Sequence, residues 1–230
     1  MKLFETSRQA GRIPLVLVLG ECIASTRLFL NAAIAQLAFE DSVAIGVKQD
    51  ALDSLRHARL IELPRLEFSA QDSCLCCGMH GALGDALRQI FFEALKVRSK
   101  RLDRVWIESN SIEPAQLAHT LRHTPFLGQR YFHQMTFRIV RLALNSDALS
   151  LDSSQWQAFV PGLRELDPVN NQAGQFLILS LSRKHIYSEG FKEWFPQVQQ
   201  DLPYKGVFYL SEEGDFGPDS LQKALGLGAN

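Results

Sequence analysis

The stretch Ile13-Pro-Leu-Val-Leu-Val-Leu-Gly20 decides the fold of this chain. It is a continuous run of apolar residues that stops at a glycine. An unbroken apolar run, unlike one that alternates with polar residues, is typical of a strand buried on both faces of a parallel sheet. The run therefore predicts a central strand with helices packed on both sides of it.

Outward from this strand, strand patterns and helix patterns alternate along the chain. Strands are expected at 43–47, 60–63, 104–108, 137–144, 176–180 and 206–210, and helices at 26–39, 83–95, 114–123, 153–165 and 188–200. This alternation predicts an α/β fold with a mostly parallel sheet and helices on both faces. We expect a single domain at 13–211, an N-terminal extension at 1–12 and a C-terminal tail at 212–230.

The composition is that of a globular protein, with 46% hydrophobic and 21% charged residues in a chain of 230. A formal net charge of -1 gives no electrostatic reason to expect nucleic acid or an anionic membrane as a partner. No apolar run approaches the roughly 20 residues needed to span a bilayer, and residues 1–12 lack the apolar core of a secretory signal. We therefore expect a cytoplasmic protein, in which cysteines are free thiols, metal ligands or catalytic groups.

The main chemical feature is the loop Cys74-Leu75-Cys76-Cys77, with His80 close behind it. Thiolates are soft ligands that favour zinc and similar ions. The expected helix after the loop directs the positive end of its dipole toward the sulfurs, which favours the thiolate form. We predict a metal site for zinc or a similar ion at Cys74, Cys76 and Cys77, with His80 as a fourth ligand. Redox-active thiols are the alternative interpretation.

Together these elements resemble the CobW-like family of P-loop GTPases, which handle metals such as zinc and cobalt. Two segments carry the resemblance: Ser73-Cys-Leu-Cys-Cys77 before a helix, and Glu108-Ser-Asn-Ser-Ile-Glu-Pro114 at the end of the next strand. The resemblance covers most of residues 13–211 and implies a P-loop GTPase-like fold. The family also carries a second, carboxy-terminal domain, which we do not expect within this chain.

The phosphate-binding loop of that family is not matched. The family's first strand runs into a glycine-rich loop that ends Gly-Lys-Thr, whereas this chain reads Gly20-Glu-Cys-Ile-Ala-Ser-Thr-Arg27. Ser25 replaces the last glycine, and Thr26 replaces the lysine that contacts the β- and γ-phosphates. Arg27 stands one position late, turned roughly 100° around the helix. Glu21 adds negative charge to a loop that would cradle an anion.

The other nucleotide motifs fail as well. The base-reading motif Asn-Lys-x-Asp is replaced by Ser180-Leu-Ser-Arg183, which puts a cation where the family has a carboxylate. Ser111 stands where the family has a glycine that contacts the γ-phosphate. Asp50 is a poor match for a family glutamate that helps to ligate metal. We therefore expect that GTP is neither bound nor hydrolysed. Glu108 is interpreted as a structural acceptor and not as a catalytic carboxylate.

Three functions follow from these patterns. The first is a metal-handling protein, similar to a metallochaperone, that binds zinc or a similar ion and passes it to a client protein. The second is a nucleotide-dead pseudo-GTPase scaffold that acts by binding a partner protein. The third is an active GTPase with unconventional residues.

Other residues receive structural interpretations. Cys22 is interpreted as a small buried hydrophobic residue, and the three tryptophans, Trp106, Trp156 and Trp194, as anchors of the core or of a helix face. His119 and His123 stand four residues apart on a predicted helix, a spacing that a metal can use. Because no partner carboxylate stands nearby, the sequence alone predicts no metal site there.

Overall fold

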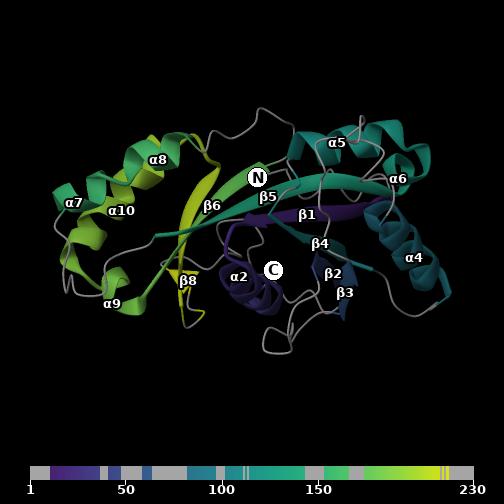
Figure 1. Ribbon diagram of the computed structural model, residues 1–230, viewed down its shortest axis with the longest axis horizontal. Coiled ribbons are helices and arrows are strands. Elements are labelled where there is room, and N and C mark those ends of the chain that lie inside the picture. The colour runs from purple at the N-terminus through teal and green to yellow at the C-terminus, as the bar shows by residue number, and fades with distance from the viewer. Residues whose placement is uncertain are drawn as a thin grey trace.

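The computed structural model describes residues 11–36, 41–47, 59–63, 82–96, 102–110, 112, 114–142, 153–165, 174–212, 214 and 216–217. Within these residues the chain forms one eight-stranded sheet with helices on both faces (Figure 1). The strand order is β3-β2-β4-β1-β5-β6-β7-β8, and every pairing is parallel except that of β7 with β8. The predicted fold class, an α/β fold with a mostly parallel sheet, is confirmed.

The elements follow the predicted alternation closely. The strands are β1 (Ile13–Gly20), β2 (Ser42–Val47), β3 (Arg59–Leu63), β4 (Arg104–Ser109), β5 (Tyr131–Arg141), β6 (Gly174–Leu181), β7 (Gly206–Ser211) and β8 (Phe216–Gly217). The helices are α2 (Ile23–Gln36), α4 (Ala82–Lys96), α5 (Pro114–His123), α6 (Pro125–Arg130), α7 (Ser153–Gln157), α8 (Val160–Glu165), α9 (Arg183–Ile186) and α10 (Glu189–Asp201).

Several elements differ from the prediction, among them α9 and β8, which were not predicted. Strand β5 begins at Tyr131 and not at Phe137, because polar residues such as His133 in its first half hide the apolar pattern. The helix expected at 153–165 is divided into α7 and α8, and α6 was not predicted. Helix α2 begins at Ile23, earlier than expected, and this difference bears on the functional site.

The handedness of the connections decides which face of the sheet each helix covers. A crossover between parallel strands is right-handed. The step from β1 to β2 runs along the sheet in the direction opposite to the steps from β3 to β4, β4 to β5, β5 to β6 and β6 to β7. Helix α2 therefore covers one face, and the later helices cover the other.

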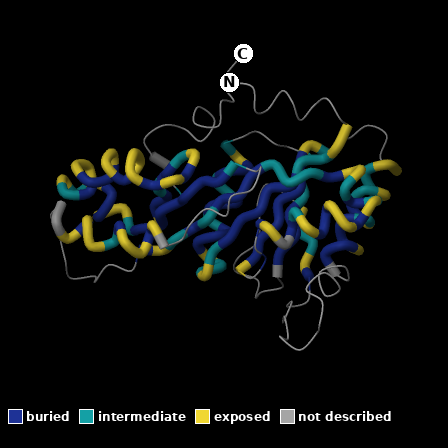
Figure 2. The backbone as a smooth tube through the Cα atoms, turned by 90° about the horizontal axis from the view of Figure 1, so that it is seen from above, coloured by how far each residue is buried: buried dark blue, intermediate teal, exposed yellow. Residues whose placement is uncertain are grey.

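Alternation along β1 divides the core accordingly. Val16 and Val18 are fully buried with α2, whereas Leu15 and Leu17 are fully buried in the layer that contains α4, α5 and α6. Burial of each such side chain stabilises the fold by about 1.5–3 kcal/mol. Figure 2 shows the strands as a continuous buried centre with exposed residues on the outer turns of the helices.

The tryptophans lie where the sequence predicted. Trp106, Trp156 and Trp194 are all 0% exposed. Trp106 belongs to the layer under α2, whereas Trp156 and Trp194 stack on each other with ring centroids 5.0 Å apart, in the cluster under α7 to α10. None of the described helices combines the length and the apolar character that crossing a membrane requires.

Candidate functional site

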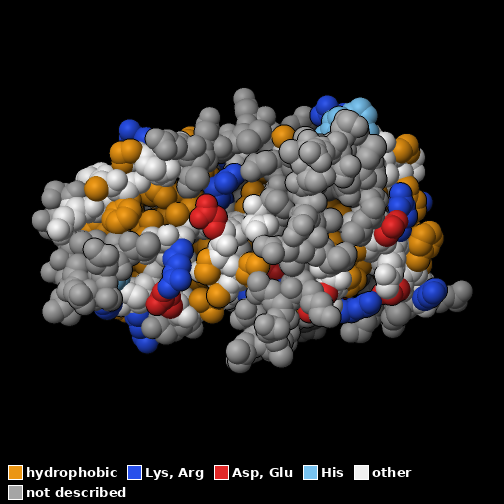
Figure 3. All heavy atoms as spheres, in the orientation of Figure 1, with side chains coloured by type: hydrophobic (Ala, Val, Ile, Leu, Met, Phe, Trp, Pro, Cys, Tyr) orange, Lys and Arg blue, Asp and Glu red, His pale blue; other side chains and the backbone are white. Residues whose placement is uncertain are grey.

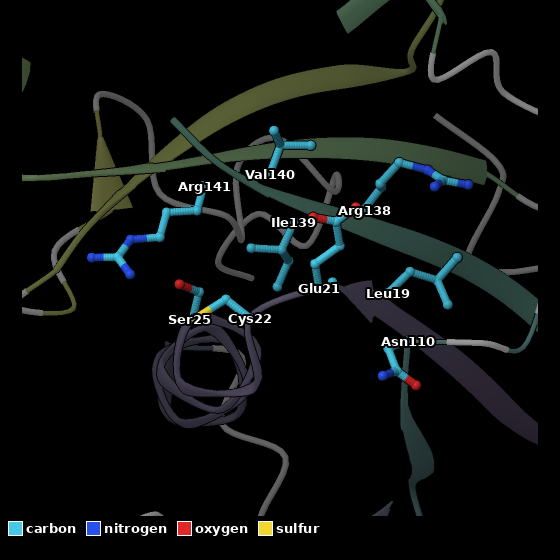
Figure 4. A pocket seen from close by; sticks show the side chains of 10 residues that line it. Leu19, Glu21, Cys22, Ser25, Asn110, Arg138, Ile139, Val140 and Arg141 are labelled. Atoms are coloured by element: carbon cyan, nitrogen blue, oxygen red, sulfur yellow. The ribbon is translucent and has the colours of Figure 1, made fainter. Parts of the chain in front are cut away.

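The candidate site lies where the order of the sheet reverses. From β1 the chain moves to β2 on one side, and from β5 it moves to β6 on the other. In open α/β sheets, ligands bind outside the carboxyl ends of the strands at such a switch point. A cavity of about 470 Å³ lies there (Figure 4). Its lining residues are Leu19, Gly20, Glu21, Cys22, Ser25, Asn110, Arg138, Ile139, Val140 and Arg141.

The connection from β1 to α2 is short. Only Glu21 and Cys22 lie between the strand and the helix, which begins at Ile23. The N–H of Thr26 donates to the carbonyl oxygen of Cys22 at 3.0 Å, so Thr26 already belongs to the first turn of the helix. A Cβ on Gly20 would lie 2.5 Å from Cγ2 of Thr26, which explains why only glycine fits there. The segment that forms an open phosphate loop in P-loop proteins is therefore largely a helical turn in this chain.

A buried polar network joins α2 to the end of β4. Nε of Arg27 donates to Oε2 of Glu108 at 2.9 Å, and both side chains are 4% exposed. Oγ1 of Thr26 lies 2.7 Å from Oε1 of the same carboxylate and 2.8 Å from the carbonyl oxygen of Ile23. Gly46 on β2 makes room for the network, because a Cβ there would lie 2.5 Å from Oε2 of Glu108. This geometry agrees with the interpretation of Glu108 as a structural acceptor.

The residues at the degenerate nucleotide motifs divide into two groups. Gly20 and Ser25 line the cavity, whereas Thr26, Arg27 and Glu108 are not among its lining residues. Thr26 and Arg27 both bind the carboxylate of Glu108 inside the protein instead. The cation that stands nearest to the family's lysine in sequence is therefore directed toward the core.

Cys22 differs from the expectation, because it is only half-buried and lines the cavity. The hydroxyl of Ser25 donates to its sulfur, and the backbone N–H groups of Ser25 and Ala24 also contribute, so that the pKa of Cys22 lies below the ordinary value of a thiol. Ser180 of β6 donates in turn to Oγ of Ser25 at 3.4 Å. Sequence reasoning missed this arrangement because the helix was expected to begin later. A cysteine followed three residues later by serine, at a helix start, is the signal that could have indicated it.

Arg138 and Arg141 bring positive charge to the cavity, and the sequence did not single them out. They stand three positions apart on β5, so their side chains leave opposite faces of the strand. Figure 4 shows them extending in opposite directions, with Cys22 and Ser25 together at the start of α2. Nη2 of Arg141 lies 3.1 Å from Oε1 of Glu212. The two guanidinium groups therefore do not converge on one anion.

The segment in the place of the base-reading loop follows β6. Strand β6 ends at Leu181 and α9 begins at Arg183. The guanidinium carbon of Arg183 lies 5.8 Å from the centroid of the Tyr187 ring, within the range of a cation–π contact. The position that holds a carboxylate in the family is thus occupied by a cation stacked on an aromatic ring.

The predicted metal ligands Cys74, Cys76, Cys77 and His80 lie outside the described residues, as do Asp50 and Ser111. In the part of the chain that the structure describes, no group of three or more His, Cys, Asp and Glu side chains is arranged to hold a metal ion. Helix α4 begins at Ala82, close to the predicted start of the helix after the cysteine loop. The metal site itself stays a prediction from the sequence.

No protein-family model matches the chain, and no curated protein matches it in sequence. Among solved structures, the chain is similar to PAB0955, a GTPase in apo form from Pyrococcus abyssi, with 12% identity and a TM-score of 0.49 over 94% of this chain and 97% of that chain. It is also similar to FlhF complexed with GTP and Mg²⁺, with 13% identity and a TM-score of 0.33 over 88% of this chain and 67% of that chain. Likenesses this distant establish no activity and no ligand for this chain.

The class of fold follows from the topology described above. Two residues join the central strand β1 to α2, and Glu108 is the last residue but one of the neighbouring strand β4. The described residues therefore form an open, mostly parallel α/β fold.

Proposed function

We propose that this chain is a CobW-like metal-binding protein whose P-loop GTPase-like fold neither binds nor hydrolyses GTP at the β1–α2 junction. The proposal has two halves, the loss of GTP binding (the nucleotide half) and the binding of a metal ion (the metal half). The buried ion pair between Arg27 and Glu108 supports the nucleotide half. The metal half rests on the cysteine loop in the sequence.

The ion pair occupies the positions that would hold Mg²⁺. In P-loop NTPases, a Ser or Thr of the phosphate loop and an acidic residue of the Walker-B strand hold the Mg²⁺ ion, while a lysine cradles the phosphates. In this chain, Arg27 stands at the Ser or Thr position, and Glu108 is the last residue but one of the strand next to β1. The guanidinium of Arg27 neutralises that carboxylate without a metal ion. Thr26 cannot supply the charge of the missing lysine.

The energies involved are large enough to weaken nucleotide binding. Separating one partner from a buried ion pair costs about 3–5 kcal/mol. A micromolar affinity corresponds to about 8 kcal/mol of binding free energy, so a ligand that had to break the Arg27–Glu108 pair would be left with millimolar affinity. The early start of α2 and the carboxylate of Glu21 at the cavity should lower the affinity for a triphosphate further.

The metal half concerns a soft ion in a reducing, cytoplasmic setting. Cys74, Cys76 and Cys77 would supply three thiolates to zinc or a similar ion, and His80 a fourth ligand. A metal site of this kind exchanges its ion by ligand replacement, so that transfer to a client protein needs no hydrolysis of GTP.

Metal analysis of freshly purified, untagged protein tests this half. We expect about one equivalent of zinc or a similar ion in the wild type, as in a site with one set of thiolate ligands, and its loss in Cys76→Ser. Cys22→Ser is the matched control and should keep the metal, because Cys22 lies at the β1–α2 junction. Absence of metal from the wild-type protein would overturn the metal half.

Equilibrium binding of labelled GTP with Mg²⁺ tests the nucleotide half. We expect no saturable binding at micromolar nucleotide, in the wild type and equally in Thr26→Lys, because a lysine alone does not reopen the helical turn or release Glu108 from Arg27. Saturable binding at micromolar GTP would overturn this half while leaving the metal half standing.

A nucleotide-dead scaffold is the second candidate, and one feature favours it. Phe92 and Leu95 on α4 are 51% and 60% exposed, and Phe92 stacks on Phe126 of α6 with ring centroids 5.8 Å apart. Exposed apolar side chains of this size are common where proteins bind one another. An active GTPase with unconventional residues has the least support, because the phosphate-loop and base-reading positions both depart from the required chemistry.

A further inference from the structure

The last two turns of α5 carry a pair of exposed histidines. The rings of His119 and His123 lie with their centroids 4.1 Å apart and their planes at 40°. Both side chains are exposed. Figure 3 shows histidine atoms gathered at the surface over α5.

The burial of α5 explains why this pair faces outward. Leu117, Thr120 and Leu121 are 0%, 2% and 7% exposed and hold one face of the helix against the sheet and its neighbours. Residues four apart on a helix lie on the same face, one above the other. His119 and His123 are therefore held together on the face opposite to the core. Among the described residues, neither ring takes part in a hydrogen bond or an ion pair.

We propose that His119 and His123 form a two-histidine site for a divalent transition-metal ion of the zinc, nickel and copper class. Neutral imidazole suits these ions, and two histidines one turn apart on a helix can bind a single ion. The pair also lies at the carboxyl end of α5, where the helix dipole favours a cation.

The surroundings determine what kind of site this is. Two imidazoles leave several coordination positions to water, and Arg122 adds a positive charge on an adjacent part of the last turn. The site therefore binds its ion more weakly than a closed four-ligand site and exchanges it readily. Both of its ligands come from α5.

Titration of the full-length, untagged protein with Ni²⁺ tests the site. Paramagnetic Ni²⁺ broadens the NMR signals of ring protons close to it, and signals are assigned by single substitutions. We expect His119 and His123 to broaden together, at lower Ni²⁺ than any other described histidine, while the buried His185 stays sharp. In His119→Asn, the broadening of His123 should shift to much higher Ni²⁺, and the reverse should hold in His123→Asn.

Two outcomes would overturn the proposal. If His123 broadens at the same Ni²⁺ concentration with and without His119, the two rings bind as separate imidazoles and form no site. If neither ring responds before the buried histidines do, no ion binds there. The same titration in Cys76→Ser separates this site from the cysteine loop: the response of His119 and His123 should be unchanged, whatever the metal content of the loop.

Discussion

Nε of Arg27, on α2, lies 2.9 Å from Oε2 of Glu108, at the end of β4, and both side chains are 4% exposed. A buried ion pair adds little net stability compared with apolar residues of the same shape, but loss of one partner leaves a buried charge without compensation. The pair therefore makes the β1–α2 junction sensitive to single substitutions. Three predictions concern this site and its surroundings, and a fourth concerns His133 on β5.

Replacement of Arg27 by Met should destabilise the protein by about 3–5 kcal/mol, because Glu108 would stay buried without its cation. The free energy of unfolding in urea measures the loss. The double variant Arg27→Met with Glu108→Gln should recover a large part of it, because the second substitution removes the orphan charge. If the loss in the double variant equals the sum of the losses in Arg27→Met and Glu108→Gln, the two side chains do not interact directly.

Substitution of Gly46 by Ala should also destabilise the protein, by about 1–3 kcal/mol, because the new methyl group has no room. Its Cβ would lie 2.5 Å from Oε2 of Glu108, which cannot move without weakening its bond to Arg27. Gly162→Ala in α8 is the matched control, because a Cβ there meets nothing within 4 Å. That variant should be neutral or slightly stabilised in the same urea titration. Similar losses at both positions would speak against the steric explanation.

The reactivity of Cys22 should depend on Ser25. Because the Ser25 hydroxyl is the main cause that lowers the pKa of Cys22, Ser25→Ala should raise that pKa. The thiolate is the reactive form, so alkylation of Cys22 by iodoacetamide near neutral pH should slow in the variant, and its pH profile should move to higher pH. Mass spectrometry of the peptide that contains Cys22 follows this thiol apart from the other three cysteines. An unchanged profile would mean that Ser25 does not set the reactivity.

Stability should fall in mild acid because of His133. Burial lowers the pKa of His133 to about 4, and its Nε2 lies 2.9 Å from Oγ1 of Thr136. An unfolded histidine has a pKa of about 6.5, so the unfolded chain takes up the proton first. The stabilising difference is complete above about pH 6.5 and is lost as the pH falls toward 4, by an amount on the order of 2–3 kcal/mol.

His133→Gln removes the titrating group and keeps a partner for Thr136, so it is the matched variant for this effect. The free energy of unfolding of wild type minus that of the variant, measured between pH 7 and pH 4, should decrease as the pH falls. A difference that stays constant over this interval would show that His133 is not the cause.

Most of the fold was predictable because the buried face of each strand or helix requires apolar residues at a regular spacing along the chain. The apolar run at 13–19 belongs to the strand that the topology places in the centre of the sheet, and each helix with a clear apolar face was found close to its true limits. The first half of β5 was missed, because His133 and its neighbours break the apolar pattern there. These side chains become hydrogen-bonded or buried only when the strand pairs with β1.

The sequence by itself determined the α/β alternation and the loss of the lysine and glycines that a phosphate loop needs, because these depend on residue type and on spacing along the chain. Only the tertiary structure decided where Arg27 points, that Cys22 faces a cavity, and that Gly46 makes room for Glu108. Arg27 and Glu108 are separated by 81 positions and meet only because β4 pairs with β1. Local patterns record which face of a strand or helix is buried, but the partner of a buried charge depends on the order of strands in the sheet.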